Sequence, residues 1–200
     1  MAIALVILAG GKATRMGGGD KPLIPLAGRP ILDHILARLP QIGHPIALNV
    51  NGESSAFDAY SLPVLADSLP DHPGPLAGVL AGLDWAAGLP GITDLITLPG
   101  DCPFPPRDLM EKLVEARKKG GTPLACASSG GRSHPIIALW PVEARETIRS
   151  ALQAGELKVG RLIEEIGCTR VEWPTMPFDP FLNINTPEDV ASAEQLIARF

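Results

Sequence analysis

The sequence predicts an α/β protein with three α/β/α layers, in which helices cover both faces of a mostly parallel, Rossmann-like sheet. Two kinds of segment, which alternate along the chain, predict this class. Short apolar runs bounded by Gly, Pro, Asn or Asp alternate with longer stretches of helical spacing. Such alternation is typical of parallel strands joined by helices. The chain has 200 residues, 46% of them hydrophobic, so we expect residues 1–200 to form a single domain.

The apolar runs give the expected strands, and the periodic stretches give the expected helices. The strands are expected at residues 3–8, 45–50, 63–65, 95–98, 123–127 and 135–140. The helices are expected at residues 31–39, 76–87, 107–119 and 142–154. A last helix is expected from Pro187 to about Arg199, because Thr186 can cap it and proline suits the first helical position.

A glycine-rich, cationic loop follows the first expected strand. From Leu8 to Lys21 the sequence reads LAGGKATRMGGGDK. Glycines let backbone N–H groups approach an anion closely, Lys21 adds a movable charge, and Arg15 adds a planar fork that can grip two oxygens. The spacing matches neither the Walker A loop nor the G-x-G-x-x-G dinucleotide fingerprint. We therefore expect a phosphate-binding loop of another type.

Further polar residues follow the other expected strands at their carboxyl ends, where ligands bind in open α/β sheets. Gly10 and Gly11 follow the first strand, Asn49 and Asn51 the second, Asp67 the third and Asp101 the fourth. We expect these residues to meet at one edge of the sheet.

Some of these positions, and Gly78 in a later helix, can be interpreted in two ways from the residues alone. Asp101 is a candidate ligand for Mg²⁺, which needs only one or two carboxylates beside phosphate and water, but it could also bond its own turn. Asn49 or Asn51 could read the edge of a base or end a strand. Gly78 in a first helical turn costs about 1 kcal/mol relative to Ala, which indicates close approach of a ligand or of a packing neighbour.

Composition excludes several function classes. A net charge of −5 disfavours nucleic-acid binding, while the cations near the glycine loop suit a small polyanion. The three cysteines contain no C-x-x-C pair, so neither a disulfide framework nor a zinc cluster is expected. No apolar run approaches the roughly 18 residues of a membrane span and no leader is evident, so we expect no membrane contact and a cytoplasmic protein.

The glycine loop resembles the signature L-A-G-G-x-x-x-R-M/F-G-x-x-K of nucleotidyltransferases with a glycosyltransferase-A-like fold. Within that group, the string GGGDK at residues 17–21 is most similar to the molybdenum cofactor guanylyltransferases. Further matching segments come in the family's order, at residues 67–68, 73–78, 98–104, 133–135 and 183–189. The resemblance implies a nucleotide-diphospho-sugar transferase type of fold and Mg²⁺-dependent transfer of GMP from GTP to molybdopterin.

The resemblance also implies roles for individual residues. Those implied as catalytic are Arg15, Lys21 and Asp101, with Asp101 as the metal ligand. The residues implied to bind the nucleotide are Leu8, Ala9, Gly10, Gly11, Lys21, Asn49, Asn51, Asp67, Gly78 and Asp101. The residues implied to bind the acceptor are His134, Asn183 and Asn185. Residues 155–158 resemble a loop on the acceptor side, but carry less basic charge there than the family often does. Asp67 as a turn cap, His134 as a loop histidine, and asparagines that bond backbone remain open alternatives.

The partners implied are small molecules, GTP and molybdopterin, with neither nucleic acid nor membrane. Transient contact with proteins that deliver molybdopterin or mature molybdoenzymes is compatible with this activity. Two other enzymes remain alternatives, a cytidylyltransferase for the same cofactor and a sugar-phosphate nucleotidyltransferase. A non-catalytic nucleotide-binding regulatory subunit is the alternative of a different class.

Overall fold

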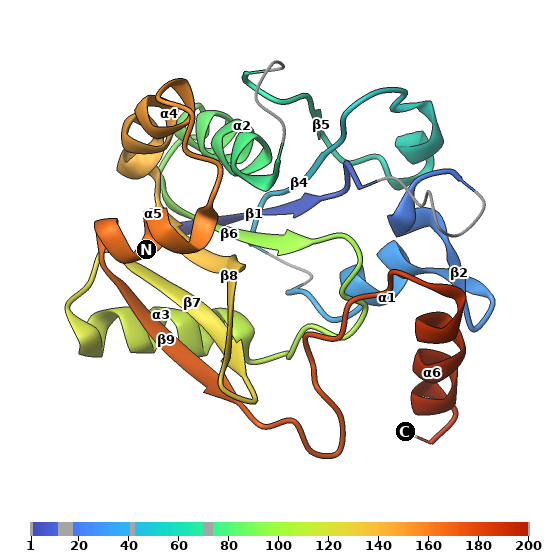
Figure 1. The fold of residues 1–200 in the computed structure, drawn as a ribbon. Helices are drawn as coiled ribbons and strands as arrows, with labels where there is room; N and C mark the ends of the chain where they lie inside the picture. Colours follow the sequence, from blue (N-terminus) through green and yellow to red (C-terminus); the bar gives the residue numbers. More distant parts are fainter. Residues whose placement is uncertain (1, 12–17, 41–42, 70–73, 200) are drawn as a thin grey trace.

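The computed structural model describes residues 2–11, 18–40, 43–69 and 74–199, which build a seven-stranded sheet in the order β5-β4-β1-β6-β8-β7-β9 (Figure 1). Its strands are β1 (Ala2–Leu8), β4 (Ile46–Asn49), β5 (Val64–Leu65), β6 (Ile92–Pro99), β7 (Leu124–Ser129), β8 (Arg132–Pro141) and β9 (Cys168–Trp173). Strand β8 runs antiparallel to both neighbours, and the other neighbouring pairs are parallel. The predicted mostly parallel sheet is confirmed.

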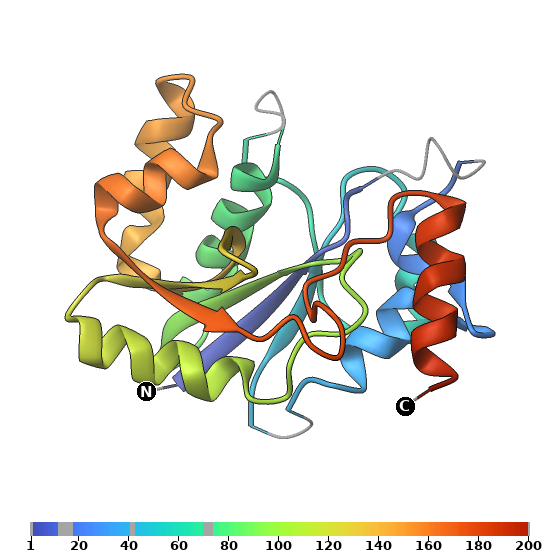
Figure 2. The ribbon, with the colours of Figure 1, turned by 60° about the horizontal axis from the view of Figure 1, so that its bottom comes forward.

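Helices cover both faces of this sheet. They are α1 (Ile31–Leu36), α2 (Pro75–Ala87), α3 (Leu109–Gly120), α4 (Arg145–Gln153), α5 (Val159–Ile166) and α6 (Pro187–Ile197), with 3-10 turns η2 (Lys21–Leu23), η3 (Ser55–Tyr60) and η4 (Val142–Ala144). Helices α2, α4 and α5 lie over one face, and α1 and α3 lie over the other (Figure 2). The three layers predicted from the sequence are therefore present. Within the described ranges, no helix has both the length and the apolar character needed to span a bilayer.

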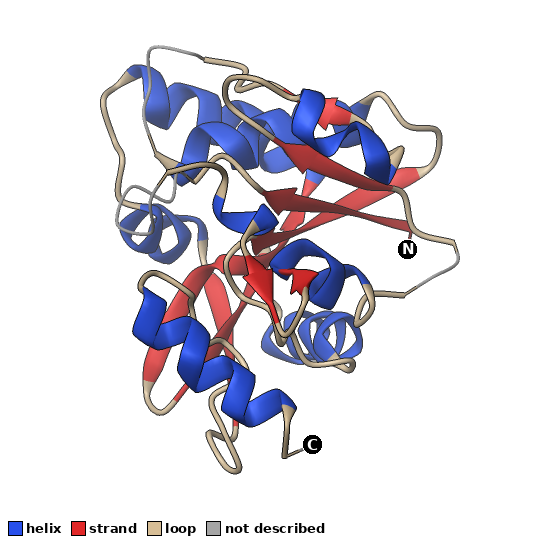
Figure 3. Ribbon diagram, turned by 90° about the vertical axis from the view of Figure 1, so that its right-hand side faces the viewer, coloured by secondary structure: helices blue, strands red, loops and turns tan. Residues whose placement is uncertain are grey.

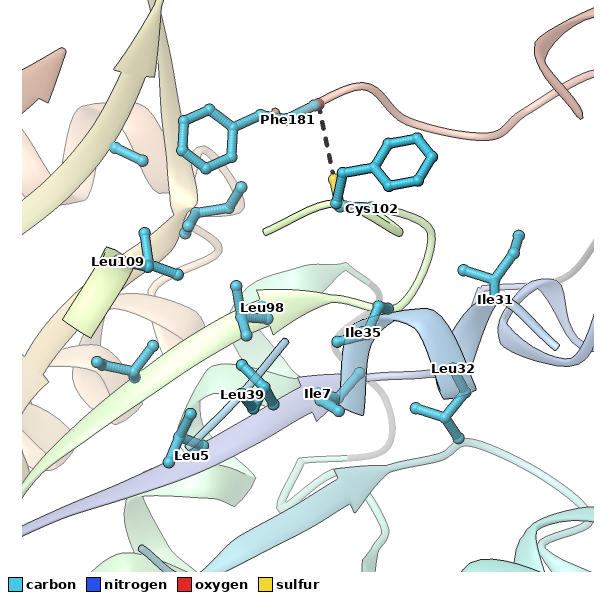
Figure 4. Close-up of a cluster of buried hydrophobic side chains, with 14 of the residues drawn as sticks. Leu5, Ile7, Ile31, Leu32, Ile35, Leu39, Leu98, Cys102, Leu109 and Phe181 are labelled. Atoms are coloured by element: carbon cyan, nitrogen blue, oxygen red, sulfur yellow. Dashed lines mark hydrogen bonds between the residues drawn. The ribbon is translucent and has the colours of Figure 1, made fainter. Parts of the chain in front are cut away.

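Strand β1 divides the core because successive side chains of a strand point to opposite faces. Leu5 and Ile7 belong to the core under α1 and α3, and Ala4 and Val6 to the core under α2. Figure 4 shows the first of these cores, with Ile35 of α1 lying against β1 and β6. Since β1 is buried on both faces, its end is a rigid base for the glycine loop that follows.

The chain's last helix packs beside a short two-stranded ribbon. The ribbon consists of β2 (Pro25–Leu26) and β3 (Arg29–Pro30), and Figure 3 views the molecule from this side. The Ala27 backbone N–H donates to Glu194 Oε1 of α6 at 2.9 Å. At the start of α6, Thr186 Oγ1 accepts from the Asp189 N–H and the Asp189 carboxylate accepts from the Thr186 N–H, a capping box. The predicted Thr186 cap is thus confirmed.

Several predicted boundaries differ from the structure. The helix expected at 142–154 is divided into η4 and α4, and the strand expected at 135–140 extends to Arg132 and is antiparallel. Helix α5 and strand β9 are additional elements. β9 mixes exposed and partly buried residues with the buried Trp173 and includes the charged Arg170 and Glu172, so it lacks the continuous apolar run that marks the other strands. An edge strand of this kind gives a weak sequence signal.

Buried side chains join β8 to β6. The Trp140 indole N–H donates to Thr97 Oγ1 at 2.8 Å, and the Thr97 hydroxyl donates to the Ile136 carbonyl. Both Thr97 and Trp140 are fully buried. A buried donor or acceptor left without a partner costs about 1 to 3 kcal/mol.

We expect Thr97→Val to lower the free energy of unfolding by about 2 kcal/mol, because the indole N–H and the Ile136 carbonyl both lose their partner. Urea unfolding would measure the change. Thr97→Ser is the matched control, since it keeps the hydroxyl and should lose clearly less. Equal losses in the two variants would show that packing, and not the hydrogen-bonded chain, sets the effect.

Candidate functional site

A cleft of about 520 Å³ lies at the carboxyl ends of β1, β4 and β6 and at the start of β8. Many of the predicted site residues line it, namely Leu8, Gly10, Gly11, Lys21, Asn49, Asn51, Asp101, His134 and Asn183. Four others do not belong to its lining, namely Ala9, Asp67, Gly78 and Asn185. Arg15 lies outside the described residues. The expected meeting of strand-end motifs at one edge of the sheet is present.

Lys21 and Asp101 form the centre of the cleft. Lys21 Nζ lies 3.2 Å from Asp101 Oδ2 and 2.5 Å from Asn185 Oδ1, so the ammonium bridges two segments distant in sequence. The other Asp101 oxygen accepts from Asn183 Nδ2 at 3.2 Å. The Lys21 and Asp101 side chains are 20% and 17% exposed. This partly desolvated ion pair holds the start of η2, the turn after β6 and the segment before α6 together.

The segment before α6 is fixed to the same turn through its backbone. The Ile184 N–H donates to the Asp101 carbonyl at 2.8 Å, and the Asn185 N–H donates to Asp189 Oδ2 at 2.8 Å. The carboxylate that caps α6 therefore also fixes Asn185. Although Asn185 is outside the cleft lining, its amide oxygen determines where Lys21 points.

Close backbone contact brings the strand ends of β1 and β6 together. The Gly100 N–H donates to the Leu8 carbonyl at 2.9 Å. A Cβ on Gly100 would lie 2.7 Å from Pro22 Cγ and 3.0 Å from the Leu8 carbonyl oxygen, distances that real Cβ atoms hardly show. Glycine at this position is therefore needed to keep Asp101 next to the residues that follow the glycine loop.

A second polar cluster forms where β4 and β5 end. Asp67 accepts from both predicted asparagines, from Asn49 Nδ2 at 2.9 Å and from Asn51 Nδ2 at 2.7 Å. Asn49 Nδ2 also donates to the Leu65 carbonyl at 3.2 Å, and Asn49 is only 3% exposed. Asp67 therefore orients two amides at the cleft without lining the cleft itself.

Gly78 makes close contact with this cluster. A Cβ on Gly78 would overlap Asn49 Oδ1 and would lie 3.0 Å from Leu8 Cδ2. The close approach expected at Gly78 is therefore that of a protein neighbour, Asn49, and this neighbour lines the cleft.

His134 is part of a hydrogen-bonded chain on the β8 side of the cleft. Its Nε2 lies 2.7 Å from Ser129 Oγ, and the Ser129 hydroxyl donates to Asp179 Oδ1 at 2.9 Å. Since Ser129 has one proton and gives it to Asp179, the ring N–H is on Nε2, and Nδ1 of the neutral ring is left as an acceptor. Burial chiefly lowers the pKa of His134, and the Arg132 charge lowers it further, against the effect of Asp179.

This lowered pKa predicts how stability depends on pH. In the unfolded chain histidine has its ordinary pKa of about 6.5, so below that pH the unfolded state binds more protons at this residue than the folded state does. The contribution of His134 to stability is therefore present at pH 7.5 and is reduced as the pH falls below 6.5. We expect the difference in unfolding free energy between wild type and His134→Gln to be larger at pH 7.5 than at pH 5.5 in urea titrations. A difference that grows at pH 5.5 would contradict the direction of the shift.

Cys102, next to Asp101, is a buried side chain and not a nucleophile. Its thiol contacts the Phe181 carbonyl at 3.7 Å (Figure 4) and Asn183 Oδ1 at 3.3 Å. Burial chiefly raises the pKa of the Cys102 thiol, and Asp101 raises it further. The residue thus stays protonated and packs the Asp101 turn against the segment before α6.

Sequence reasoning missed Arg132, which also lines the cleft. The signal was the cation after the Gly130-Gly131 pair, two residues before His134. Residues 155–158, which resemble an acceptor-side loop, connect α4 to α5 and do not belong to the cleft lining.

Comparison with known proteins agrees with this architecture. Residues 5–169 match the model of the MobA-like NTP transferase domain. A molybdenum cofactor guanylyltransferase of Rhodopseudomonas palustris is 50% identical over 196 residues, which cover 97% of this chain and 93% of the relative. One of Bradyrhizobium is 48% identical over 98% of this chain and 94% of the relative. The chain belongs to the molybdenum cofactor guanylyltransferase family.

Solved structures share the family's fold at lower identity. Molybdopterin-guanine dinucleotide biosynthesis protein A from Archaeoglobus fulgidus superposes with a TM-score of 0.76 at 22% identity, over 98% of this chain and all of that chain. A CMP:2-keto-3-deoxy-manno-octonic acid synthetase complexed with CTP superposes with a TM-score of 0.75 at 15% identity, over all of this chain and 99% of that one. The nucleotide-diphospho-sugar transferase type of fold is thereby confirmed.

Proposed function

We propose that this chain transfers GMP from GTP to molybdopterin, with release of pyrophosphate, to form the guanine dinucleotide form of the molybdenum cofactor. The observation that carries the proposal is the set of hydrogen bonds that joins Lys21, at the end of the glycine loop, to Asp101 and Asn185, and Asp101 to Asn183, in a chain of this family. A cationic glycine loop suits the triphosphate, and the cleft leaves room beside it for a second substrate.

The proposed reaction needs alignment and charge neutralisation. An oxygen of the acceptor's terminal phosphate forms a bond to the α-phosphorus of GTP. The bond from that phosphorus to the α–β bridging oxygen breaks, and its electron pair leaves with pyrophosphate. The attacking phosphate is already ionised at neutral pH, so no general base is required. Lys21 and Arg15 would neutralise charge on the triphosphate, and Asn185 would hold the ammonium of Lys21 in position.

The residues at the β6 turn fit a Mg²⁺ ion that enters with the nucleotide. Asp101 is the carboxylate at the cleft, and among the described residues no group of three or more His, Cys, Asp or Glu could form a protein cage. Mg²⁺ is commonly held by one or two carboxylates together with substrate phosphates and water. When bound, it would offset negative charge on the phosphates. Before that, Lys21 neutralises the Asp101 carboxylate.

The cluster at the ends of β4 and β5 suits recognition of a base. Asp67 fixes the amides of Asn49 and Asn51, and Asn51 keeps a second N–H that Asp67 does not take. A preorientated donor is suited to an acceptor on guanine. The alternative of a cytidylyltransferase or sugar-phosphate nucleotidyltransferase would use the same loop for a different base or acceptor.

Mass analysis of the product made from GTP, Mg²⁺ and molybdopterin tests the proposal. The expected product is the pterin guanine dinucleotide, formed together with one pyrophosphate. Parallel reactions with CTP and UTP test base preference, and a product formed from CTP but not from GTP would make the chain a cytidylyltransferase. Binding of GTP without release of pyrophosphate would favour the non-catalytic regulatory subunit.

A further inference from the structure

Arg132 occupies a defined position at the cleft, at the start of β8. It follows the turn of Gly130 and Gly131, whose φ values are 55° and 75°. Two consecutive left-handed residues are what a tight hairpin of the type I′ class requires, and glycine adopts them without strain. Arg132 is thereby held on the first rung of the hairpin, opposite Ser129. Since strand residues two apart share a face, Arg132 and His134 point to the same side of the sheet.

The guanidinium of Arg132 is available to bind an anionic ligand. Lys21 and Arg132 are the cations among the described residues that line the cleft, and Lys21 is paired with Asp101. No ion pair joins Arg132 to another residue in the described ranges. The nearby Glu172 carboxylate instead accepts from the Gly131 N–H at 3.1 Å. Among the described residues that line the cleft, Arg132 is therefore a cation outside any ion pair, on the β8 side.

Arg132 lines the same cleft as Asp101, the candidate metal ligand, and as His134. Burial chiefly lowers the pKa of the His134 ring, and the charge of Arg132 lowers it further, which agrees with a guanidinium near that ring.

The order of the strands separates Arg132 from the glycine loop. The loop follows β1, Asp101 follows β6 and Arg132 begins β8, and these three strands are consecutive in the sheet. In phosphoryl-type transfer the attacking and leaving oxygens lie roughly in line, on opposite sides of the phosphorus. With pyrophosphate leaving on the side of the glycine loop, the attacking phosphate must approach from the side of β8.

We propose that Arg132 binds the terminal phosphate of the acceptor and positions it for attack. The inference rests on the proposed function. A guanidinium can grip two oxygens of one phosphate, which fixes the direction of approach as well as offsetting the repulsion between two anionic substrates. The neutral His134 ring beside it, which keeps Nδ1 as an acceptor, adds no charge that would compete for this phosphate.

A binding experiment tests Arg132 separately from the reaction. The probe is the fluorescent, oxidised form of molybdopterin, with and without its terminal phosphate, titrated into wild type, Arg132→Ala and Arg132→Lys. The matched control is Arg161→Ala, an exposed arginine of α5 that pairs with Glu165. Thermal unfolding with and without GTP and Mg²⁺ monitors the fold and the nucleotide site.

We expect wild type and Arg161→Ala to bind the phosphorylated pterin more tightly than the dephosphorylated one by about 10- to 100-fold. Arg132→Ala should lose this preference and keep both its affinity for the dephosphorylated pterin and its stabilisation by GTP. Arg132→Lys should keep part of the preference, because lysine keeps the positive charge but cannot donate two parallel hydrogen bonds to one phosphate.

The possible failures are distinguishable. If Arg132→Ala keeps the preference for the phosphorylated pterin while wild type transfers GMP, the role of Arg132 is wrong and the proposed function stands. Loss of GTP stabilisation in Arg132→Ala, or equal weakening of both pterins, would also overturn the role. If wild type binds neither pterin, the proposed function fails and the inference fails with it.

Discussion

Replacing Asp101 by Asn is expected to lower the turnover number for pyrophosphate release by about 1,000-fold while leaving the fold intact. The carboxylate is the candidate metal ligand, and it also receives hydrogen bonds from Lys21 and Asn183. A metal ion at a phosphate stabilises the transition state by several kcal/mol, and about 4 kcal/mol corresponds to the expected factor. Asn has nearly the same shape, so the variant loses charge and not volume. Steady-state release of pyrophosphate at saturating GTP and Mg²⁺ measures the effect.

The matched control is Asp58→Asn, which removes an exposed carboxylate in η3, away from the cleft lining. It should keep the wild-type rate. In Asp101→Asn, one of the two donors loses an acceptor oxygen, so the free energy of unfolding should fall by only about 1 kcal/mol. A near-normal rate with unchanged dependence on Mg²⁺ would show that Asp101 serves its own turn and is not the metal ligand.

The second large effect is expected for Gly78→Ala, which should lower the free energy of unfolding by about 2 to 3 kcal/mol and weaken GTP binding at least tenfold. The added methyl group overlaps Asn49 Oδ1, and Asn49 is buried and held by both Leu65 and Asp67. It therefore cannot move without breaking hydrogen bonds, and overpacking typically costs 1 to 3 kcal/mol. Urea unfolding and titration with GTP would measure the two losses.

A double-mutant cycle identifies the cause. In an Asn49→Ala background the obstructing oxygen is absent, so Gly78→Ala should become neutral, or stabilising by up to about 1 kcal/mol through its better helix propensity. The sign of the substitution would then depend on its neighbour. If Gly78→Ala costs the same in both backgrounds, Asn49 is not the obstacle, and contact of Gly78 with another group would explain the glycine.

The architecture was largely predictable because each buried parallel strand carries its own signal. The run of β1 is apolar without interruption, and the turns after β1 and β6 carry Gly10-Gly11 and Gly100-Asp101 at the carboxyl ends, where ligands bind. The direction of β8 was not predictable, since an apolar run does not reveal which way a strand runs. β9 was missed because its exposed residues dilute the apolar pattern.

The site was predictable as a set of residues but not as a set of contacts. The glycine loop indicated Lys21, but nothing local indicated that Asn185, 164 positions later, fixes its ammonium. Gly78 was recognised as a position of close approach, yet its neighbour Asn49 comes from a different strand. Arg132 was missed. Its importance depends on the antiparallel course of β8, which a linear sequence does not display.

The reversed strand β8 has a consequence for how such enzymes can diversify. Because β8 runs against β6, the hairpin of Gly130 and Gly131 reaches the same edge of the sheet as the strand ends that carry the glycine loop and Asp101. Exposed hairpin tips tolerate insertions and substitutions better than buried strand ends do. With the roles proposed above, a change in this one turn would alter the acceptor side of the cleft at Arg132 and leave the side of Lys21 and Asp101 unchanged, so the two substrate preferences could evolve separately.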